Sequence, residues 1–136
     1  MTRVVLDTNV VVSAMLSRRG NEARVVWLAQ SGRLLPCVTN EILAEYDEVL
    51  HRPQFKVLDQ NEVRGVLAGL GQGLMVRPAF SLAVSPDQPD SRFLECAQAA
   101  NAEFLVTGNK RHFPTTWQDT RIVNARELLE AILFPE

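Results

Sequence analysis

Short apolar segments alternate with amphipathic segments along nearly the whole chain, and this alternation constrains the fold more than any other feature. Five apolar runs predict strands at residues 4–6, 34–38, 74–76, 103–106 and 121–123. Six segments have helical spacing, at residues 10–16, 22–30, 41–51, 61–70, 92–100 and 125–133. Strands that alternate with helices pair in parallel through right-handed crossovers, so the sequence predicts an α/β fold of three layers.

Segment 41–51 illustrates the helical pattern, because its apolar residues recur at intervals of three and four. One face of this helix carries Ile42, Leu43, Tyr46, Val49 and Leu50. Thr39 or Asn40 offers an N-cap, and Pro53 follows the last turn. Residues 78–89 contain three prolines and predict a loop that leads into the helix at 92–100.

Composition favours a single domain over residues 1–136. A chain of 136 residues that is 46% hydrophobic is long enough to bury a core. Its apolar runs are far shorter than the roughly 18 residues of a membrane span. The N-terminus also lacks the pattern of a secretory signal, so we expect a cytoplasmic protein. Cys37 and Cys96 have no metal-ligand spacing, which favours buried thiols over a zinc site.

The net charge of −2 excludes the strong overall basic field that marks many nucleic-acid-binding proteins. Contact with RNA or DNA would therefore depend on a local group of cations. The candidates are Arg18 with Arg19, Arg24, and the run Lys110, Arg111 and His112.

Asp7 directly follows the first predicted strand. In a sheet flanked by helices, ligands bind at the carboxyl ends of the strands, so Asp7 would lie at the mouth of a site. The competing interpretation is that Asp7, Thr8 or Asn9 only caps the helix that follows.

Two further acids fall where this fold brings strand ends and helix starts together. Glu45 borders the apolar stripe of its helix, whereas Glu41 and Glu48 lie on the polar side. Asp90 stands at the start of the helix at 92–100, where it also suits an N-cap. Asp87 is either a loop residue or a further acid at the same mouth.

Clustered carboxylates without zinc-type ligands favour a hard cation, Mg²⁺ or Mn²⁺, because these ions prefer oxygen ligands. Without the cation, the gathered carboxylates would repel one another. Such an ion stabilises charge on a phosphodiester and lowers the pKa of a bound water. The acidic residues Asp7, Glu45 and Asp90 therefore suggest phosphodiester hydrolysis.

The chain resembles the PIN-domain family of metal-dependent ribonucleases, in particular the small toxins of prokaryotic toxin–antitoxin pairs. The resemblance covers nearly the whole chain in four segments, at residues 5–14, 38–46, 87–97 and 102–113. The first contains the Asp-Thr-Asn sequence at 7–9. In the second, Thr39 precedes an acid by six positions and so selects Glu45. The third supplies Asp90, and the fourth has Thr107 and Gly108 after a strand.

The resemblance implies a three-layer domain whose central parallel five-stranded sheet has the order 3-2-1-4-5. It implies Asp7, Glu45 and Asp90 as catalytic metal ligands for Mg²⁺ or Mn²⁺, with supporting polar groups from Thr8, Asn9, Thr107 and Asp87. The family usually has an Asp where this chain has Asn109. An amide oxygen can still contact a metal, but it carries no charge and cannot act as a base. We assign Arg18, Lys110 and Arg111 to RNA phosphates, since phosphate contacts position a strand without reading its sequence.

The leading hypothesis is therefore an endoribonuclease toxin that cuts RNA, is held inactive by a cognate antitoxin protein and forms a homodimer or higher homo-oligomer. One alternative is a phosphohydrolase of the haloacid-dehalogenase type, which also has an Asp after its first strand. That type needs a second Asp at position 9, where this chain has Asn9. The other alternative is a PIN-like module that binds RNA or a protein and cleaves little, which Asn109 and the negative net charge favour.

Overall fold

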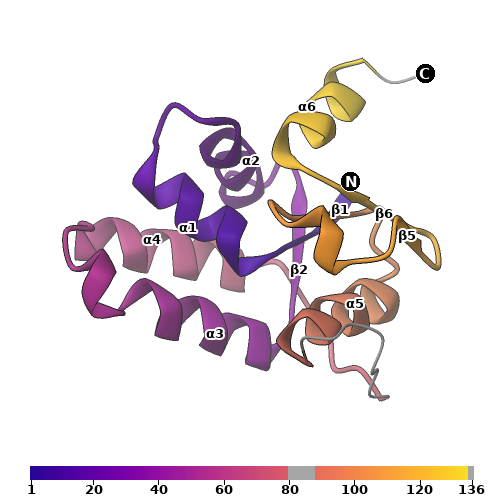
Figure 1. The fold of residues 1–136 in the computed structure, drawn as a ribbon, viewed down its shortest axis with the longest axis horizontal. Helices are drawn as coiled ribbons and strands as arrows, with labels where there is room; N and C mark the ends of the chain where they lie inside the picture. The colour runs from indigo at the N-terminus through magenta and orange to yellow at the C-terminus, as the bar shows by residue number, and fades with distance from the viewer. Residues whose placement is uncertain (80–87, 135–136) are drawn as a thin grey trace.

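The computed structural model describes residues 1–79 and 88–134, and for residues 88–90 it describes the backbone alone. A six-stranded sheet of order β3-β2-β1-β4-β6-β5 crosses the molecule (Figure 1). The strands are β1 (Arg3–Leu6), β2 (Leu35–Val38), β3 (Leu74–Met75), β4 (Phe104–Val106), β5 (Thr116–Trp117) and β6 (Thr120–Val123). The helices are α1 (Thr8–Leu16), α2 (Asn21–Gln30), α3 (Asn40–Leu50), α4 (Gln60–Gly71), α5 (Gln88–Ala100) and α6 (Ala125–Leu133), with short 3₁₀ helices η1 (Pro53–Phe55) and η2 (Lys110–His112).

The predicted parallel sheet is present, and its five predicted strands have the predicted order. β1 pairs in parallel with β2 on one side and with β4 on the other, and β4 pairs in parallel with β6. The prediction of five strands was wrong by one, because β5 adds an antiparallel edge strand beside β6. The turn between them contains Gln118 at a φ of 54°. It has no Asn-Gly or Asp-Gly pair, the usual sequence signal of a tight hairpin, so this hairpin could not be expected from the residues of its turn.

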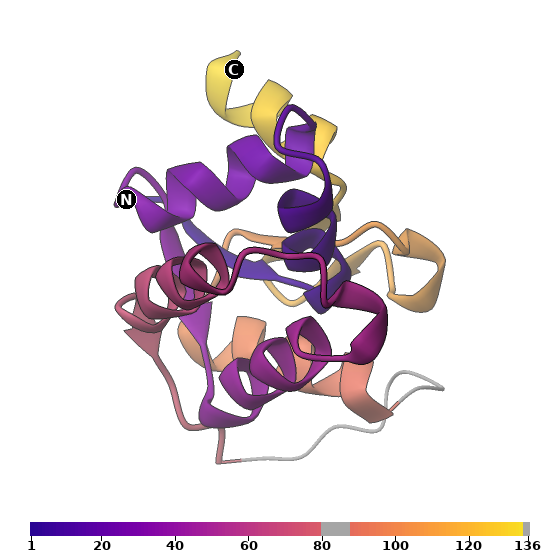
Figure 2. The ribbon, with the colours of Figure 1, turned by 90° about the vertical axis from the view of Figure 1, so that its left-hand side faces the viewer.

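The helices form layers on both faces of the sheet. In both ribbon views α2 and α6 lie on one side of the sheet, and α3 and α5 lie on the other (Figures 1 and 2). Helix α5 packs against β1, β2 and β4, whereas α2 packs against β2 and α6 against β4. Helix α1 follows β1 after a single residue and contacts both α2 and α3.

The central strands are apolar on both faces, as expected for a parallel sheet covered by helices. Val4, Val5 and Leu6 of β1 are at most 1% exposed. Both cysteines are buried and free, as predicted. Burial raises the pKa of the Cys37 thiol to about 11, and it also raises the pKa of Cys96. In the described part of the chain, no helix has the length and apolarity that a membrane crossing requires.

Two helix starts refine the sequence predictions. Helix α3 is capped by Thr39 rather than Asn40, since Thr39 Oγ1 accepts a hydrogen bond of 3.0 Å from the Ile42 backbone N–H. Helix α5 begins at Gln88, four residues before the predicted start, so Asp90 lies inside its first turn and the interpretation of Asp90 as an N-cap was wrong. Pro89 is compatible with this earlier start, because proline is tolerated in the first turn of a helix. Most of the loop predicted at 78–89 lies outside the described residues.

Candidate functional site

Asp7 lies at the carboxyl end of β1, where the strand meets α1 and the end of β4. Its backbone N–H donates to the carbonyl of Val106 at 2.9 Å, and its side chain is buried, with the residue only 6% exposed. Asp7 occupies the N-cap position of α1, but its side chain makes no capping hydrogen bond. Instead, Asp7 Oδ2 accepts hydrogen bonds from Thr107 Oγ1 at 2.7 Å and from Asn9 Nδ2 at 3.0 Å. The carboxylate is therefore held by side chains at the mouth of the site, which the capping interpretation does not explain.

The turn after β4 completes this hydrogen-bond network. Thr107 is fully buried, and its Oγ1 also accepts from the backbone N–H of Asn109 at 3.0 Å. The backbone N–H of Gly108 donates to Asn9 Oδ1 at 3.0 Å. Asn9 thus joins the two strand ends, donating to one and accepting from the other. The network fixes residues that the sequence separates by about a hundred positions.

Helix α3 approaches the same strand end from the other side. Glu45 is half-buried, and its carboxylate accepts a hydrogen bond from Thr8 Oγ1. Tyr46, only 1% exposed, donates its phenol O–H to the backbone carbonyl of Leu6. Burial raises the pKa of Tyr46, and coupling to the neighbouring acidic groups of Cys96, Asp7 and Glu45 raises it further, so the phenol stays a hydrogen-bond donor at neutral pH. Consecutive residues of α3 therefore bind the two residues that flank Asp7.

The sequence did not identify the hydroxyl of Tyr46 as part of this site. The apolar stripe correctly predicted that Tyr46 faces the core, and a buried phenol needs a hydrogen-bond partner. That requirement was the available signal, but the sequence could not show which carbonyl would accept the bond.

The third predicted acid is placed only by its backbone. Asp90 lies in the first turn of α5, and this helix packs against both β1 and α3. An ion pair of 2.6 Å between Arg92 and Glu41 joins the start of α5 to the start of α3. The side chain of Asp90 and the whole of Asp87 lie outside the described residues. Among the side chains that the structure describes, no group of three or more His, Cys, Asp or Glu residues gathers as a metal site.

A hollow of about 210 Å³ lies beside the network. Its lining comes from α1, from the start of α2 and from the turn after β4, and comprises Asn9, Val10, Ser13, Glu22, Gly108 and Asn109. Asn109 is exposed there. Glu22 contributes an acid from α2 that the sequence motifs did not select. The polar side-chain atoms of Asp7, Glu45 and Glu22 are oxygens, the donor type that hard divalent cations prefer.

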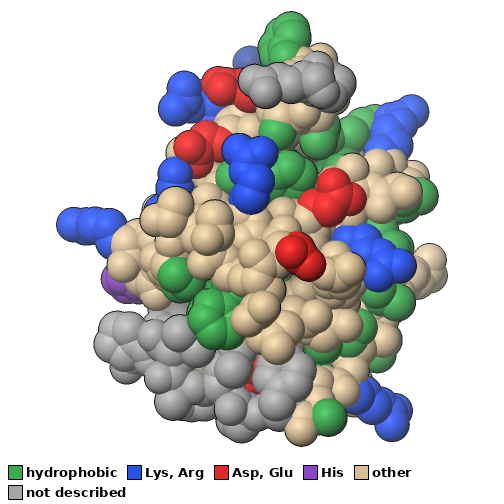
Figure 3. Space-filling model, turned by 90° about the vertical axis from the view of Figure 1, so that its right-hand side faces the viewer, with side chains coloured by type: hydrophobic (Ala, Val, Ile, Leu, Met, Phe, Trp, Pro, Cys, Tyr) green, Lys and Arg blue, Asp and Glu red, His purple; other side chains and the backbone are tan. Residues whose placement is uncertain are grey.

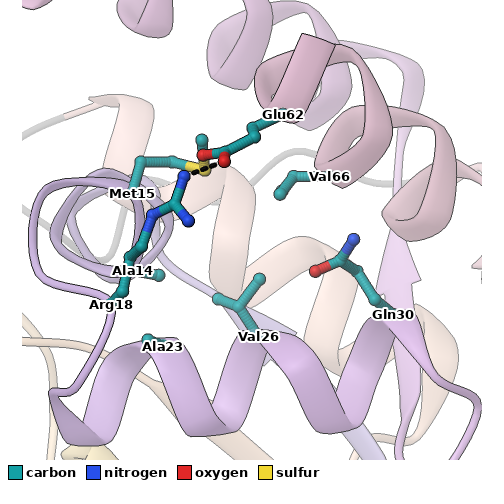
Figure 4. A pocket seen from close by; sticks show the side chains of 8 residues that line it. All are labelled: Ala14, Met15, Arg18, Ala23, Val26, Gln30, Glu62 and Val66. Carbon is teal, nitrogen blue, oxygen red and sulfur yellow. Dashed lines mark ion pairs between the residues drawn. The ribbon is translucent and has the colours of Figure 1, made fainter. Parts of the chain in front are cut away.

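The three cations predicted to bind RNA occupy different surroundings. Arg18 pairs with Glu62 at a separate hollow of about 240 Å³ between α1, α2 and α4, lined also by apolar side chains such as Met15 and Val66 (Figure 4). Lys110 forms an ion pair of 2.8 Å with Glu127. Arg111 is exposed and has no ion-pair partner among the described residues. On the face seen in Figure 3, where described residues form the surface, the cations stand apart from one another.

Comparison with known proteins adds two findings. The family described as PIN domain matches residues 3–111 of the chain, a range that includes Asp7, Glu45, Asp90 and Asn109. An uncharacterized protein of the archaeon Methanocaldococcus jannaschii is 23% identical over 111 residues, which cover 79% of this chain and 71% of that protein.

Proposed function

The chain belongs to the PIN-domain family, whose members are generally nucleases, and from this premise we propose that it is a metal-dependent endoribonuclease that hydrolyses RNA phosphodiester bonds. The observation that carries the proposal is the buried carboxylate of Asp7, held through Oδ2 by Thr107 and Asn9 at the end of a central strand. Burying a carboxylate is costly unless its surroundings compensate it. A site that orients a carboxylate in this way is suited to holding a cation.

The oxygen donors of the site fit Mg²⁺ or Mn²⁺. We assign Asp7, Glu45 and Asp90 as ligands, with Asn109 as a neutral oxygen donor at the edge of the site. When bound, the cation supplies positive charge beside the scissile phosphate and lowers the pKa of a water for attack. Thr107 and Asn9 orient Asp7, and the hydroxyl of Thr8 orients Glu45. These hydrogen bonds keep two like-charged carboxylates in place despite their mutual repulsion.

The decisive experiment measures cleavage of labelled single-stranded and structured RNAs by the wild type and by Asp7→Asn, with Mn²⁺, Mg²⁺ or EDTA. Asp119→Asn is the matched control, because it removes the same charge from an exposed residue in the β5–β6 turn. We expect EDTA to abolish cleavage and Asp7→Asn to reduce it by more than about a hundredfold, since the variant loses a metal ligand. Asp119→Asn should cleave like the wild type.

Substantial cleavage by folded Asp7→Asn protein would contradict the assignment. No cleavage by the wild type, together with RNA binding that survives EDTA, would instead support a PIN-like binding module. The neutral side chain of Asn109 is the observation that favours this second function. The dehalogenase type receives no such support, because Asn9 donates its amide to Asp7 and has no acidic proton for a leaving group.

We also propose that Lys110, Arg111 and Arg18 contact RNA phosphates. Arg111 has the strongest support, since it is exposed and follows Asn109 closely in the chain. In the Asp7→Asn background, which prevents cleavage, Arg111→Ala should weaken RNA binding and lower the slope of log affinity against log salt by about one. Arg126→Ala, an exposed cation on α6, should leave both quantities unchanged. Equal effects of the two substitutions in a fluorescence anisotropy titration would reject the assignment of Arg111.

The proposal extends to the biological role of a toxin in a toxin–antitoxin pair. Its partners would be substrate RNA, a cognate antitoxin protein that covers the mouth of the site, and further copies of the chain in a homodimer or higher homo-oligomer. Expression of the wild type should then arrest growth unless the antitoxin is present, whereas expression of Asp7→Asn should not. Growth arrest by both proteins would separate the toxic effect from nuclease activity.

A further inference from the structure

We propose that Tyr46 is a positioning residue that sets the spacing between Asp7 and Glu45 through its hydrogen bond to the Leu6 carbonyl. The inference rests on the proposed function, because it concerns the same pair of carboxylates. It goes beyond that function by assigning a role to a buried side chain outside the proposed set of metal ligands and RNA-binding cations.

The peptide bond between Leu6 and Asp7 has a defined direction. Its N–H points toward β4, since Asp7 N donates to Val106. In a trans peptide the carbonyl points the opposite way, so the Leu6 carbonyl faces the β2 side of β1. The β1–β2 pairing covers Arg3 with Leu35 and Val4 with Pro36. Strand β2 ends at Val38, and the chain then turns into α3 at Thr39.

Tyr46 supplies a donor at the place where the two strands separate. Its O–H donates to the Leu6 carbonyl from α3, which covers this end of the sheet. A buried carbonyl requires a hydrogen-bond partner, and Tyr46 is only 1% exposed, so bulk water is excluded around its ring. The phenol therefore replaces the backbone hydrogen-bond donor that β2 would supply if its pairing with β1 extended to Leu6.

The bond also couples the two carboxylates. Glu45 precedes Tyr46 on α3 and accepts a hydrogen bond from Thr8, while Tyr46 binds Leu6. Asp7 lies between Leu6 and Thr8 in the chain. One turn of α3 is therefore hydrogen-bonded both to the residue before Asp7 and to the residue after it. Loss of the Tyr46 bond removes one of the two hydrogen bonds by which Glu45 and Tyr46 attach α3 to the residues beside Asp7, and leaves the bond from Thr8 to Glu45. The separation of the carboxylates is then less well fixed.

Loss of a purely structural anchor would lower stability without changing the affinity for Mn²⁺, whereas loss of a positioning residue would change both. The chain offers a matched control for this comparison. Thr120 is 2% exposed and donates its hydroxyl to the Ala102 carbonyl at 2.7 Å. Thr120 begins β6, so it lies at the opposite end of the sheet from Asp7. Tyr46→Phe and Thr120→Val both delete a buried hydroxyl-to-carbonyl bond while nearly conserving side-chain shape. Both should lower the melting temperature of the metal-free protein.

The first test measures Mn²⁺ dissociation constants by electron paramagnetic resonance for the wild type, Tyr46→Phe, Thr120→Val and Asp7→Asn. We expect Tyr46→Phe to bind Mn²⁺ about tenfold more weakly than the wild type, as is typical when a group that supports a ligand is lost. Thr120→Val should bind like the wild type. Wild-type affinity in Tyr46→Phe, or an equal loss in Thr120→Val, would overturn the positioning role.

A second measurement keeps the wild-type packing nearly intact and covers the case in which Tyr46→Phe does not fold. Tyr46 is the only tyrosine of the chain, so incorporation of 3-fluorotyrosine labels this site alone. Addition of Mg²⁺ should shift the fluorine resonance to a saturating value, and Asp7→Asn should remove the shift. A resonance that stays unchanged while Mg²⁺ binds would overturn the proposal.

The two proposals fail in distinguishable ways. If the wild type shows no Asp7-dependent binding of Mn²⁺, the metal assignment fails and the positioning role falls with it. If the wild type binds Mn²⁺ through Asp7 and Tyr46→Phe binds it equally well, only the positioning role is contradicted.

Discussion

Asn109 leaves the edge of the candidate site without the negative charge that an aspartate would carry at this position. It is exposed and lines the same hollow as Glu22 and Asn9. Asn109→Asp adds a formal charge without a large change in side-chain shape. We expect the variant to bind Mn²⁺ about tenfold more tightly, because ligand charge is one of the quantities that tune affinity for divalent cations. Isothermal titration calorimetry measures the change directly.

Asn101→Asp is the control for this prediction. Asn101 is also exposed, lies in the turn between α5 and β4 and has a φ of 53°, a conformation that Asp tolerates. The substitution Asn101→Asp therefore adds the same charge away from the hollow and should leave the affinity for Mn²⁺ unchanged. Weaker or unchanged binding by Asn109→Asp would show that Asn109 does not face the cation.

At the residue scale, the sequence motifs identified most of the polar groups that come together. Asp7, Asn9 and Thr107 form one hydrogen-bond network, and Thr8, the next residue after Asp7, forms a separate bond to Glu45. The pairing of these groups could not be predicted, because it depends on side-chain directions at the end of the sheet. Glu22 was missed since no motif marks it, and it reaches the hollow only through the packing of α2 against α1.

At the scale of helices and strands, periodicity was a reliable guide to the existence of the elements that bury one face, but not to every helix start. Helix α6 begins and ends at the predicted residues, and its start is reinforced by a capping box between Asn124 and Glu127. The strand that was not predicted, β5, and the misplaced start of α5 have weaker local signals. Strand β5 has only two residues, and the predicted start of α5 was placed after Pro89 although proline suits a first helical turn.

Gly73 controls the junction between α4 and β3. A Cβ atom at this position would lie 2.0 Å from the backbone carbonyl oxygen of Pro36 in β2, so the backbone would have to move. We expect Gly73→Ala to lower the free energy of unfolding by about 1–3 kcal/mol, the usual range for overpacking. Urea denaturation followed by circular dichroism measures the loss.

Gly65, in the helix that precedes Gly73, has free space where Gly73 has none. It lies in α4, is exposed, and a Cβ atom there would meet nothing within 4 Å. Gly65→Ala should raise the free energy of unfolding by up to about 1 kcal/mol, because alanine has the higher helix propensity. If Gly73→Ala raised the free energy of unfolding as Gly65→Ala is expected to do, the close approach of Gly73 to β2 would be refuted.

At the scale of the whole molecule, the buried cysteines make stability sensitive to alkaline pH. Burial of the Cys37 thiol raises its pKa in the folded state to about 11, above the ordinary value of 9.0 that applies once the chain unfolds. The unfolded state therefore releases this proton first as the pH rises. The contribution of Cys37 to stability is complete below about pH 9 and is lost as the pH approaches 11, with a loss on the order of 2 kcal/mol.

Comparison of the wild type with Cys37→Ala isolates this contribution from other groups that titrate in the same range. The substitution removes a small buried group at every pH, whereas the titration difference appears only above about pH 9. The stability advantage of the wild type over Cys37→Ala should therefore shrink between pH 9 and 11. A constant difference in urea denaturation across this range would show that the thiol ionises as easily in the folded protein as in the unfolded chain.

The bond between Thr107 and Asp7 spans 100 positions of sequence and therefore has a consequence for biosynthesis. Domains fold while the ribosome is still extending the chain. A nascent chain that ends before β4 has neither the central neighbour of β1 nor the hydroxyl that holds Asp7. For a ribonuclease this means that the site cannot form on the translating ribosome until synthesis has passed Thr107.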